Sequence, residues 1–399
     1  MATSTSPQSV LLVTPRWTRD GGVAAHVQVS AEALARHGVQ VAVAAAKVDP
    51  GTDVPGLTVY QAPELFDRGA PAQARLGEAL SCDPEVIHLH QVDDPRLVES
   101  ARSIAPVIAS THGYTACTSG VYYFRPGEEC TRGHGPGCVP NLIARGCAHA
   151  RHPKTLPVKF KNATTGRMAL QRSDLVISYS SAVDRHLAAN GLRSRAIVPY
   201  FPTMPATRGS GHATRRRVVF AGRVVRTKGV DVLIRAAPYV DAEFVLCGDG
   251  REIDAMRELA AEVGVAERLV FRGWLAPHEL ARELAEASFV VMPSIWPEPF
   301  GLVGIEGFAA GRPAIASGTG GVSDWLDDGV SGLSVPPADI DALARAMASL
   351  LEDVDRQEQM GQAGEATVAA RFSPEHHVAA LLAGYGDARV KWRASSPGR

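Results

Sequence analysis

The stretch from Phe289 to Ala310 constrains the fold more than any other part of the chain. It begins with a short apolar run, Phe289–Pro293, whose β-branched residues predict a buried strand of a parallel sheet. A helical pattern follows at Leu302–Ala310. The turn between them therefore lies at the carboxyl end of the strand, where the first N–H groups of the helix can receive an anion.

Two glutamates flank this turn, with Glu298 on the loop and Glu306 inside the helix. A carboxylate on the helix can accept two hydrogen bonds from a vicinal diol such as a ribose, and one on the loop can reach a sugar hydroxyl. The backbone N–H groups of Gly301 and Leu302 would meet a diphosphate between them. The arrangement predicts a site for a nucleotide sugar.

This pattern resembles the Glu-x7-Glu motif of family-four retaining glycosyltransferases, also called group 1 glycosyltransferases. Upstream, a strand that ends at Gly222-Arg223 is followed by Lys228-Gly229, which matches a signature of that family. Three downstream motifs continue the resemblance: Ala309–Ser317, Gly320-Gly321 and Asp328–Leu333. The resemblance covers nearly the whole chain. It implies the α/β GT-B fold, with two facing Rossmann-like doubly wound domains and a C-terminal helix that crosses back to the first.

The length of 399 residues favours two domains, because one hydrophobic core seldom organises so long a chain. Strand patterns that alternate with helical patterns indicate parallel sheets covered on both faces. Periodicity is lost from Pro199 to Gly211, where prolines and glycines predict a linker. The predicted boundaries are 1–203 for an N-terminal acceptor-side domain, 204–216 for the linker, 217–372 for the nucleotide-sugar domain and 373–399 for the crossing helix and tail. Strands of the first domain are expected at 10–14, 39–45, 86–90, 107–111 and 175–178.

The first domain offers candidate contacts at the carboxyl ends of its strands. Gly21 and Gly22 open a helix after the first strand, where glycine lets the backbone approach a ligand closely. His112 follows the strand at 107–111, and the resemblance implies that it hydrogen bonds the transferred sugar. A general-base role is not expected, because in a retaining same-face displacement the departing phosphate can take the acceptor proton.

The leaving group determines the remaining chemistry. Breaking the bond from the anomeric carbon to the diphosphate builds negative charge on phosphate, so preorganised cations lower the barrier most. Arg223 and Lys228 are the candidates, and with the helix N–H donors they make a divalent metal unnecessary for the phosphates. The predicted catalytic residues are His112, Arg223, Lys228 and Glu298. The predicted donor-binding residues are Gly21, Gly22, Arg223, Lys228, Glu298, Phe300, Gly301, Leu302 and Glu306.

Two positions depart from the family pattern. After Gly320-Gly321, where relatives usually carry a glutamate, this chain has the shorter Asp324. Where a Pro-Asn-Gly turn is common at the end of the first domain, the chain has the segment 199–202 with the sequence Pro-Tyr-Phe-Pro. The hinge geometry is therefore not carried over from the family.

A loop at 115–152 holds four of the six cysteines, at Cys117, Cys130, Cys138 and Cys147. Their spacing lacks the tight Cys-x2-Cys pair of common zinc sites, yet four thiols in one glycine-rich loop suggest a ligand set. Additional candidate ligands are His134, His149 and His152. Structural zinc, disulfides and unlinked thiols all stay open.

The segment 132–172 contains no acidic residue. Its basic residues are Arg132, Arg145, Arg151, Lys154, Lys159, Lys161, Arg167 and Arg172. Such a segment fits either an anionic acceptor or membrane surface contacted from outside the bilayer, or a solvated helix face. Both interpretations stay open.

Charge and hydropathy exclude other classes. A formal net charge of -1 argues against a nucleic-acid binder, whose domain would be clearly basic. The first residues lack a charged n-region and an apolar h-region, and no run approaches the ~20 apolar residues of a membrane span. The expected location is cytoplasmic, with peripheral membrane contact through the basic segment as an option.

The sequence thus predicts a retaining glycosyltransferase that moves a hexose or N-acetylhexosamine from a nucleotide diphosphate sugar, with UDP favoured, to an acceptor hydroxyl. Composition typical of a high-GC bacterial genome associates it with natural-product or cell-surface glycans. A catalytically silent sugar-nucleotide-binding module is the alternative. A dinucleotide-dependent oxidoreductase is excluded, because Ile253 stands where the third glycine after Gly248 and Gly250 belongs.

Overall fold

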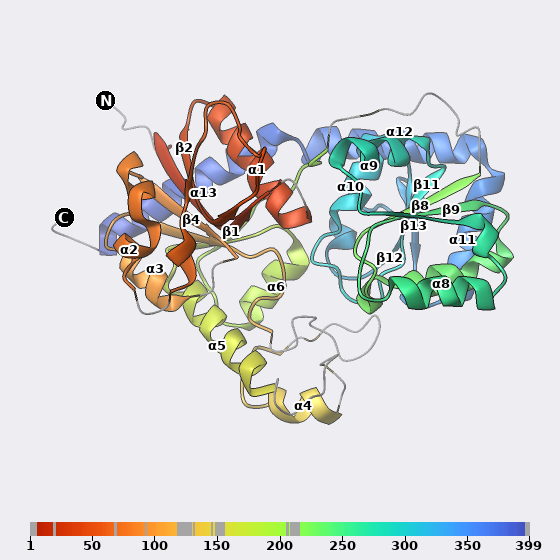
Figure 1. The fold of residues 1–399 in the computed structure, drawn as a ribbon, viewed down its shortest axis with the longest axis horizontal. Helices are drawn as coiled ribbons and strands as arrows, with labels where there is room; N and C mark the ends of the chain where they lie inside the picture. Colours follow the sequence, from red (N-terminus) through yellow and green to blue (C-terminus); the bar gives the residue numbers. More distant parts are fainter. Residues whose placement is uncertain are drawn as a thin grey trace. The chain divides into compact units, whose positions relative to one another are not determined.

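The computed structural model describes residues 6–18, 21–67, 70–91, 94–117, 130, 132–144, 147, 156–204, 207 and 216–395. They form two compact units (Figure 1). Unit 1 contains the described residues within 1–121, 131–199 and 374–399, and unit 2 contains those within 122–130 and 200–373. Apart from the assignment within 122–130, the chain passes from unit 1 to unit 2 after Pro199 and returns at Pro374.

The described part of unit 1 is built on a seven-stranded parallel sheet in the order β3-β2-β1-β4-β5-β6-β7. The strands are β1 (Ser9–Trp17), β2 (Gln40–Val48), β3 (Thr58–Gln61), β4 (Val86–His90), β5 (Val107–Ser110), β6 (Leu175–Ser178) and β7 (Arg195–Ile197). The order of strands reverses between β1 and β4, and the carboxyl ends at such a switch point form the usual ligand crevice of a doubly wound sheet.

Helices cover both faces of this sheet. They are α1 (Gly22–Arg36), α2 (Ala72–Leu76), α3 (Pro95–Ala101), α4 (Cys138–Ala144), α5 (Leu156–Arg172), α6 (Ser181–Ala189) and α13 (Pro374–Ser395), with short 3-10 turns η1 (Pro63–Phe66) and η2 (Gly77–Cys82). On one face, Leu89 of β4 packs with Leu97 of α3 and Ala169 of α5. On the other face, α13 contacts α1, β5 and β6.

Helix α13 is the C-terminal helix that returns to unit 1. The hydroxyl of Tyr385 bonds Nδ1 of His88 at 2.8 Å, and Trp392 Nε1 donates to the carbonyl of Arg102 at 2.8 Å. His377 Nδ1 lies 2.7 Å from the carbonyl oxygen of Pro199, the last residue before the chain leaves the unit. The helix is thus anchored to unit 1 along its length.

The described part of unit 2 is built on a six-stranded parallel sheet in the order β10-β9-β8-β11-β12-β13. The strands are β8 (Arg217–Ala221), β9 (Glu243–Cys247), β10 (Leu269–Gly273), β11 (Phe289–Met292), β12 (Ala314–Ser317) and β13 (Gly332–Val335). The helices are α7 (Val230–Ala236), α8 (Ile253–Glu262), α9 (Pro277–Glu286), α10 (Leu302–Ala309), α11 (Ile340–Glu352) and α12 (Val354–Arg371). The 3-10 turns are η3 (Arg226–Lys228), η4 (Ala237–Tyr239), η5 (Ala266–Arg268) and η6 (Gly321–Asp324).

The two faces of this sheet carry different helices (Figure 1). Leu233 of α7, Leu259 of α8 and Leu350 of α11 pack in one cluster against one face. Leu284 of α9 and Val303 of α10 pack in another cluster against the opposite face. The order of strands reverses between β8 and β11, so the carboxyl ends of these two strands define the crevice of unit 2.

The predicted α/β class, with two Rossmann-like sheets and a returning C-terminal helix, is confirmed. Strand β1 is longer than the expected 10–14, because its pairing with β2 continues through Arg16 and Lys47. Hydropathy alone does not predict a strand at these two charged residues. Strands β3 and β7 lie at the edges of the sheet and are partly exposed, so they lack the apolar runs by which buried strands are found.

Candidate active site

The centre of the unit 2 site is an ion pair between Lys228 and Glu298. Lys228 ends the turn η3 after β8, Glu298 lies in the loop after β11, and Nζ is 2.8 Å from Oε1. Ser294 Oγ and Trp296 Nε1 donate to the same oxygen at 2.5 Å and 2.9 Å. Burial raises the pKa of Glu298, but Lys228 and these two donors outweigh it, so that its pKa lies below the ordinary value.

Two glycines let the backbone close around this pair. A Cβ on Gly229, whose φ is +65°, would lie 1.9 Å from the carbonyl oxygen of Pro293. A Cβ on Gly320 would lie 2.2 Å from the carbonyl oxygen of Glu298, and the N–H of Gly321 donates to that oxygen at 2.7 Å. The glycines of the Lys-Gly and Gly-Gly signatures are therefore needed because the segments after β8, β11 and β12 pack too closely for a side chain.

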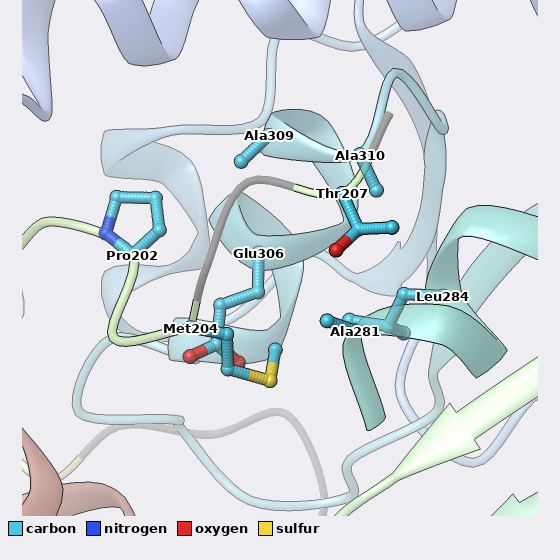
Figure 2. A pocket seen from close by; sticks show the side chains of 8 residues that line it. All are labelled: Pro202, Met204, Thr207, Ala281, Leu284, Glu306, Ala309 and Ala310. Carbon is cyan, nitrogen blue, oxygen red and sulfur yellow. The ribbon is translucent and has the colours of Figure 1, made fainter. Parts of the chain in front are cut away.

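Glu306 lies in α10 and lines a separate small pocket that is partly open to solvent (Figure 2). The pocket is lined by Pro202, Met204, Thr207, Ala281, Leu284, Glu306, Ala309 and Ala310. Thr203 Oγ1 donates to Glu306 Oε1 at 2.7 Å. Burial among these mainly apolar groups raises the pKa of Glu306 above its ordinary value, although the bond from Thr203 opposes the shift.

The remaining predicted residues of unit 2 are Arg223, after β8, and the residues at the start of α10. Gly301 is its N-cap, and no side chain caps the helix. Arg223 is exposed just beyond β8, and its guanidinium makes no hydrogen bond or ion pair to the residues that the structure describes. The ring of Phe300 is buried against Tyr200 and Phe372, so only the main chain of Phe300 can contact a donor.

In unit 1, Gly21 is the N-cap of α1 and Gly22 is its first residue, as the sequence predicted for the start of this helix. His112 follows β5 and is partly exposed. Its ring belongs to a cluster of aromatic side chains that sequence reasoning did not find. The cluster consists of His26, His88, His90, His112, Tyr179, His377 and Tyr385.

Part of this cluster carried a local signal. His88 and His90 alternate in β4, so they point to the same face of the sheet, and His90 ends the strand at the switch point. No local signal places His377 and Tyr385 beside them, because these residues come from α13 at the other end of the chain. Burial holds the pKa of His90 at about 3 and that of His377 at about 4.

The cysteine loop is only partly within the described residues. All six cysteines lie within the described residues, and the disulfide and unlinked-thiol alternatives both stay open. His134 bonds Thr164 through Nε2 at 2.8 Å, whereas His149 and His152 lie outside the described residues. Within the described part, no group of three His, Cys, Asp or Glu side chains is arranged to hold a metal ion. The zinc hypothesis stays a prediction.

The basic segment is also divided. Arg145, Arg151 and Lys154 lie outside the described residues. Arg172 forms an ion pair with Glu99 at 3.0 Å, so this charge of the basic segment has a partner within the protein. Among the helices of the described residues, none combines the length and apolarity that crossing a bilayer requires.

Two Rossmann-like units define the fold, and the carboxyl ends of β8 and β11 carry a buried acid paired with a lysine beside an uncapped helix. This is the architecture of a GT-B protein. Residues 20–199 match the family model described as "Glycosyltransferase Family 4", and residues 208–367 match the one described as "Glycosyl transferases group 1". The chain belongs to this glycosyltransferase family.

Named relatives are similar over parts of the chain. The D-inositol 3-phosphate glycosyltransferase of Nocardia farcinica is 36% identical over 197 residues, which are 45% of this chain and 42% of the relative. The GDP-mannose-dependent alpha-(1-6)-phosphatidylinositol monomannoside mannosyltransferase of Mycobacterium tuberculosis strain H37Rv is 36% identical over 169 residues, which are 40% of this chain and 44% of the relative. The match therefore spans less than half of each of these two relatives.

Solved structures support the fold over the whole length. Sucrose-phosphate synthase from Thermosynechococcus elongatus has a TM-score of 0.70 at 21% identity, covering 94% of this chain and 97% of that one. HepE from Anabaena in complex with UDP has a TM-score of 0.66 at 16% identity, covering 94% and 98%. The predicted GT-B class is confirmed.

Proposed function

We propose that this chain is a retaining glycosyltransferase that moves a hexose or N-acetylhexosamine from a nucleoside diphosphate sugar to an acceptor hydroxyl. The observation that carries the proposal is the Lys228–Glu298 ion pair at the switch point of unit 2, next to the uncapped start of α10. Family membership supports the same chemistry.

The diphosphate would be bound by the cationic side of this arrangement. An ammonium has three N–H donors, and Lys228 uses one of them on Glu298, so the others can meet phosphate oxygens. Arg223 offers an exposed guanidinium, and the first N–H groups of α10 add donors and the positive end of its dipole. These groups stabilise the negative charge that grows on the leaving phosphate.

The two carboxylates would bind the two sugars of the donor. The three donors to Glu298 all meet Oε1, and within the described residues Oε2 makes no hydrogen bond, so Oε2 is the acceptor proposed for a hydroxyl of the transferred sugar. Thr203 Oγ1 bonds Oε1 of Glu306, and Glu306 is the carboxylate proposed for the ribose hydroxyls. His112 of unit 1 is the further proposed contact to the transferred sugar.

UDP is the nucleotide that we favour, because HepE, which shares the fold over nearly its full length, was solved with UDP. The mannosyltransferase relatives are named as GDP-mannose-dependent, so GDP-mannose is the donor to compare. For the acceptor we propose a polyol or glycolipid hydroxyl, in line with the inositol-containing acceptors in the names of both relatives.

Helix α5 supplies a candidate surface for an anionic acceptor or membrane. Val158 and Met168 are 57% and 39% exposed and, with the exposed Lys161, recur at helical spacing on one face. Flotation with vesicles containing phosphatidylserine should show salt-sensitive binding that Lys161→Glu weakens. Recovery of all protein in the unbound fraction at low salt would contradict this part of the proposal.

Calorimetric titration tests the donor site. The protein would be titrated with UDP, GDP, ADP and their glucose, N-acetylglucosamine and mannose conjugates, and we expect selective binding of uridine compounds that Glu306→Ala abolishes. Glu262→Ala, which alters an exposed glutamate of α8, is the matched control. Binding with no release of nucleoside diphosphate for any acceptor would favour the silent module, and no binding of any nucleotide would overturn the donor site itself.

A further inference from the structure

The first residues of unit 2 are held against α10 at two places within that unit. The ring of Tyr200 lies against that of Phe300, just before the helix, with centroids 4.9 Å apart. Phe201 is buried, and Thr203 Oγ1 then donates to Oε1 of Glu306 at 2.7 Å. The packing of the two aromatic residues therefore brings Thr203 to the carboxylate of Glu306.

Thr203 is the partner on which the Glu306 carboxylate depends. Burial raises the pKa of Glu306, and hydrogen bonds from the side chain and the main chain of Thr203 oppose the shift. No lysine or arginine within the described residues forms an ion pair with Glu306. Glu298, the other carboxylate of the site, has Lys228 as its partner, whereas Glu306 has only the donors of a threonine.

The carboxylate keeps room for further hydrogen bonds. An ionised carboxylate has about four lone-pair positions and donates no hydrogen bond, so the donors of Thr203 do not exhaust it. Glu306 also lines the pocket that is partly open to solvent, and Pro202 and Met204, on either side of Thr203, line it too (Figure 2). An opening therefore lies beside the carboxylate and the residues that hold it.

The direction of the side chain agrees with a ribose at this place. Figure 2 shows the carboxylate of Glu306 on the side away from Ala309 and Ala310, at the end of α10. Side chains of a helix lean toward its first residues, which are the ones proposed here to bind the diphosphate. Because a ribose is joined to the diphosphate, its hydroxyls and the carboxylate lie toward the same end of α10.

We propose that Thr203 is a positioning residue, which holds the carboxylate of Glu306 in place for the two ribose hydroxyls of the donor. Thr203 thereby contributes to the selection of ribonucleotides over nucleotides that lack these hydroxyls. The inference rests on the proposed function for the identity of the ligand. Glu306 touches the ribose, whereas Thr203 acts only through Glu306.

Titration with two nucleotides tests this role. Calorimetry would compare UDP with 2′,3′-dideoxy-UDP, which lacks both ribose hydroxyls, on wild type, Thr203→Val and Thr203→Ser. We expect wild type to prefer UDP on the order of a hundredfold, and Thr203→Val to bind UDP about tenfold more weakly with unchanged affinity for the dideoxy compound. Thr203→Ser keeps the hydroxyl and should restore the preference.

The matched control is Thr367→Val, which makes the same substitution in α12. The hydroxyl of Thr367 bonds the carbonyl oxygen of Ala363 at 2.9 Å within that helix, so the preference for UDP should match that of wild type. An undiminished preference in Thr203→Val would overturn the proposal. Tighter binding of UDP by Thr203→Val would also overturn it, because Thr203 would then compete with the ribose.

The carboxylate can also be observed without any nucleotide. Carbon-13 spectra of protein labelled at the glutamate carboxyl would follow the titration of Glu306, with Glu306→Gln to assign its signal. Among the described residues that line the pocket, only Glu306 is titratable. Because hydrogen bonds from Thr203 lower its pKa, we expect a higher pKa in Thr203→Val and a value near that of wild type in Thr203→Ser. An unchanged pKa in Thr203→Val would contradict the positioning role.

The two proposals fail in distinguishable ways. If wild type binds no nucleotide, the proposed function is wrong and the role toward ribose is overturned with it. If wild type prefers UDP to the dideoxy compound and folded Thr203→Val keeps that preference, only the role of Thr203 is wrong. Thermal unfolding of every variant shows whether a loss of affinity reflects a loss of fold.

Discussion

At the scale of single residues, Lys228 and Glu298 depend on each other. The side chain of Glu298 is 3% exposed and that of Lys228 is 21% exposed, so the carboxylate carries the larger desolvation cost and the ammonium compensates it. The pair thus contributes to the fold of the site as well as to its charge. A change at Lys228 should be visible in stability before any substrate is added.

Lys228→Met should lower the free energy of unfolding by about 1–3 kcal/mol at pH 7, because it leaves a buried carboxylate without its counter-ion. The pKa of Glu298 is lowered in the folded state, so the stability it contributes is present above its unfolded pKa and is lost as pH falls through the folded pKa. Urea unfolding should therefore show a smaller gap between wild type and variant at pH 4 than at pH 7.

The control for that comparison is Lys47→Met, which removes a 3.8 Å pair whose lysine side chain is 69% exposed. It should change the free energy of unfolding by less than about 1 kcal/mol. An equal gap for Lys228→Met at both pH values would show that the ion pair is not responsible.

Arg223→Ala should remove transfer without removing the fold. The guanidinium is exposed, so the change in unfolding free energy should stay within about 0.5 kcal/mol, whereas loss of a cation at the leaving phosphate should lower kcat on the order of 10²–10³-fold. Arg226→Ala, at an exposed position in η3, is the matched control. Equal rates for the two variants would remove Arg223 from the proposed site.

At the scale of elements, the turn from η3 into α7 depends on the absence of a side chain at Gly229. Gly229→Ala should lower the free energy of unfolding by more than about 2 kcal/mol. The alanine Cβ would meet the carbonyl oxygen of Pro293, and the residue would also have to adopt a positive φ. Gly264→Ala should cost only about 1–2 kcal/mol, since φ is +74° but no atom lies within 4 Å. Equal losses of thermal stability in the two variants would show that the close contact with Pro293 does not cause the destabilisation.

The cysteine loop is the second element with a test. The zinc hypothesis predicts stoichiometric zinc in untagged protein by metal analysis, lost when Cys117 or Cys138 is changed to Ser. Cys82→Ser and Cys247→Ser should keep the metal, because these residues lie outside the loop, in η2 and β9. A metal-free wild type would leave disulfides and unlinked thiols as the remaining interpretations.

At the scale of the whole molecule, unit 1 should be the acid-sensitive unit. Five of its histidines are almost fully buried: His26, His88, His90, His186 and His377. Burial lowers the pKa of each below the ordinary value of 6.5. Each is therefore neutral when folded, and its contribution is present above pH 6.5 and is lost as pH falls below that value, toward about 3 for His90 and His186 and about 4 for His377.

Between pH 6.5 and 5 we expect the stability of unit 1 to fall by up to about 1.4 kcal/mol per pH unit for each of these histidines. Hydrogen exchange measured on β4 and β11 would separate the units, and protection of β4 should decrease first on acidification. His278→Gln, an exposed change in unit 2, should not alter this order. Earlier loss of β11 would contradict the argument.

Much of the fold was predictable, because its signals are local. The runs of β4, β6 and β11 and the start of α10 were placed from apolar periodicity and from glycine positions. Phe300 shows the limit of such reasoning: its place in the motif suggested a donor contact, yet Tyr200 and Phe372 bury its ring. The motif indicated where the chain turns, but not whether the side chain or the main chain of Phe300 stays accessible.

The sequence by itself determined the α/β class, the two sheets and the carboxylates Glu298 and Glu306, because each depends on residues close together in the chain. Only the tertiary structure decided that Lys228 pairs with Glu298, 70 positions away, and that His88 meets Tyr385, 297 positions away. The order of the strands and the return of α13 to unit 1 bring such residues together, and local hydropathy predicts neither of them. The chemistry at each site therefore depends on contacts that exist only in the folded protein.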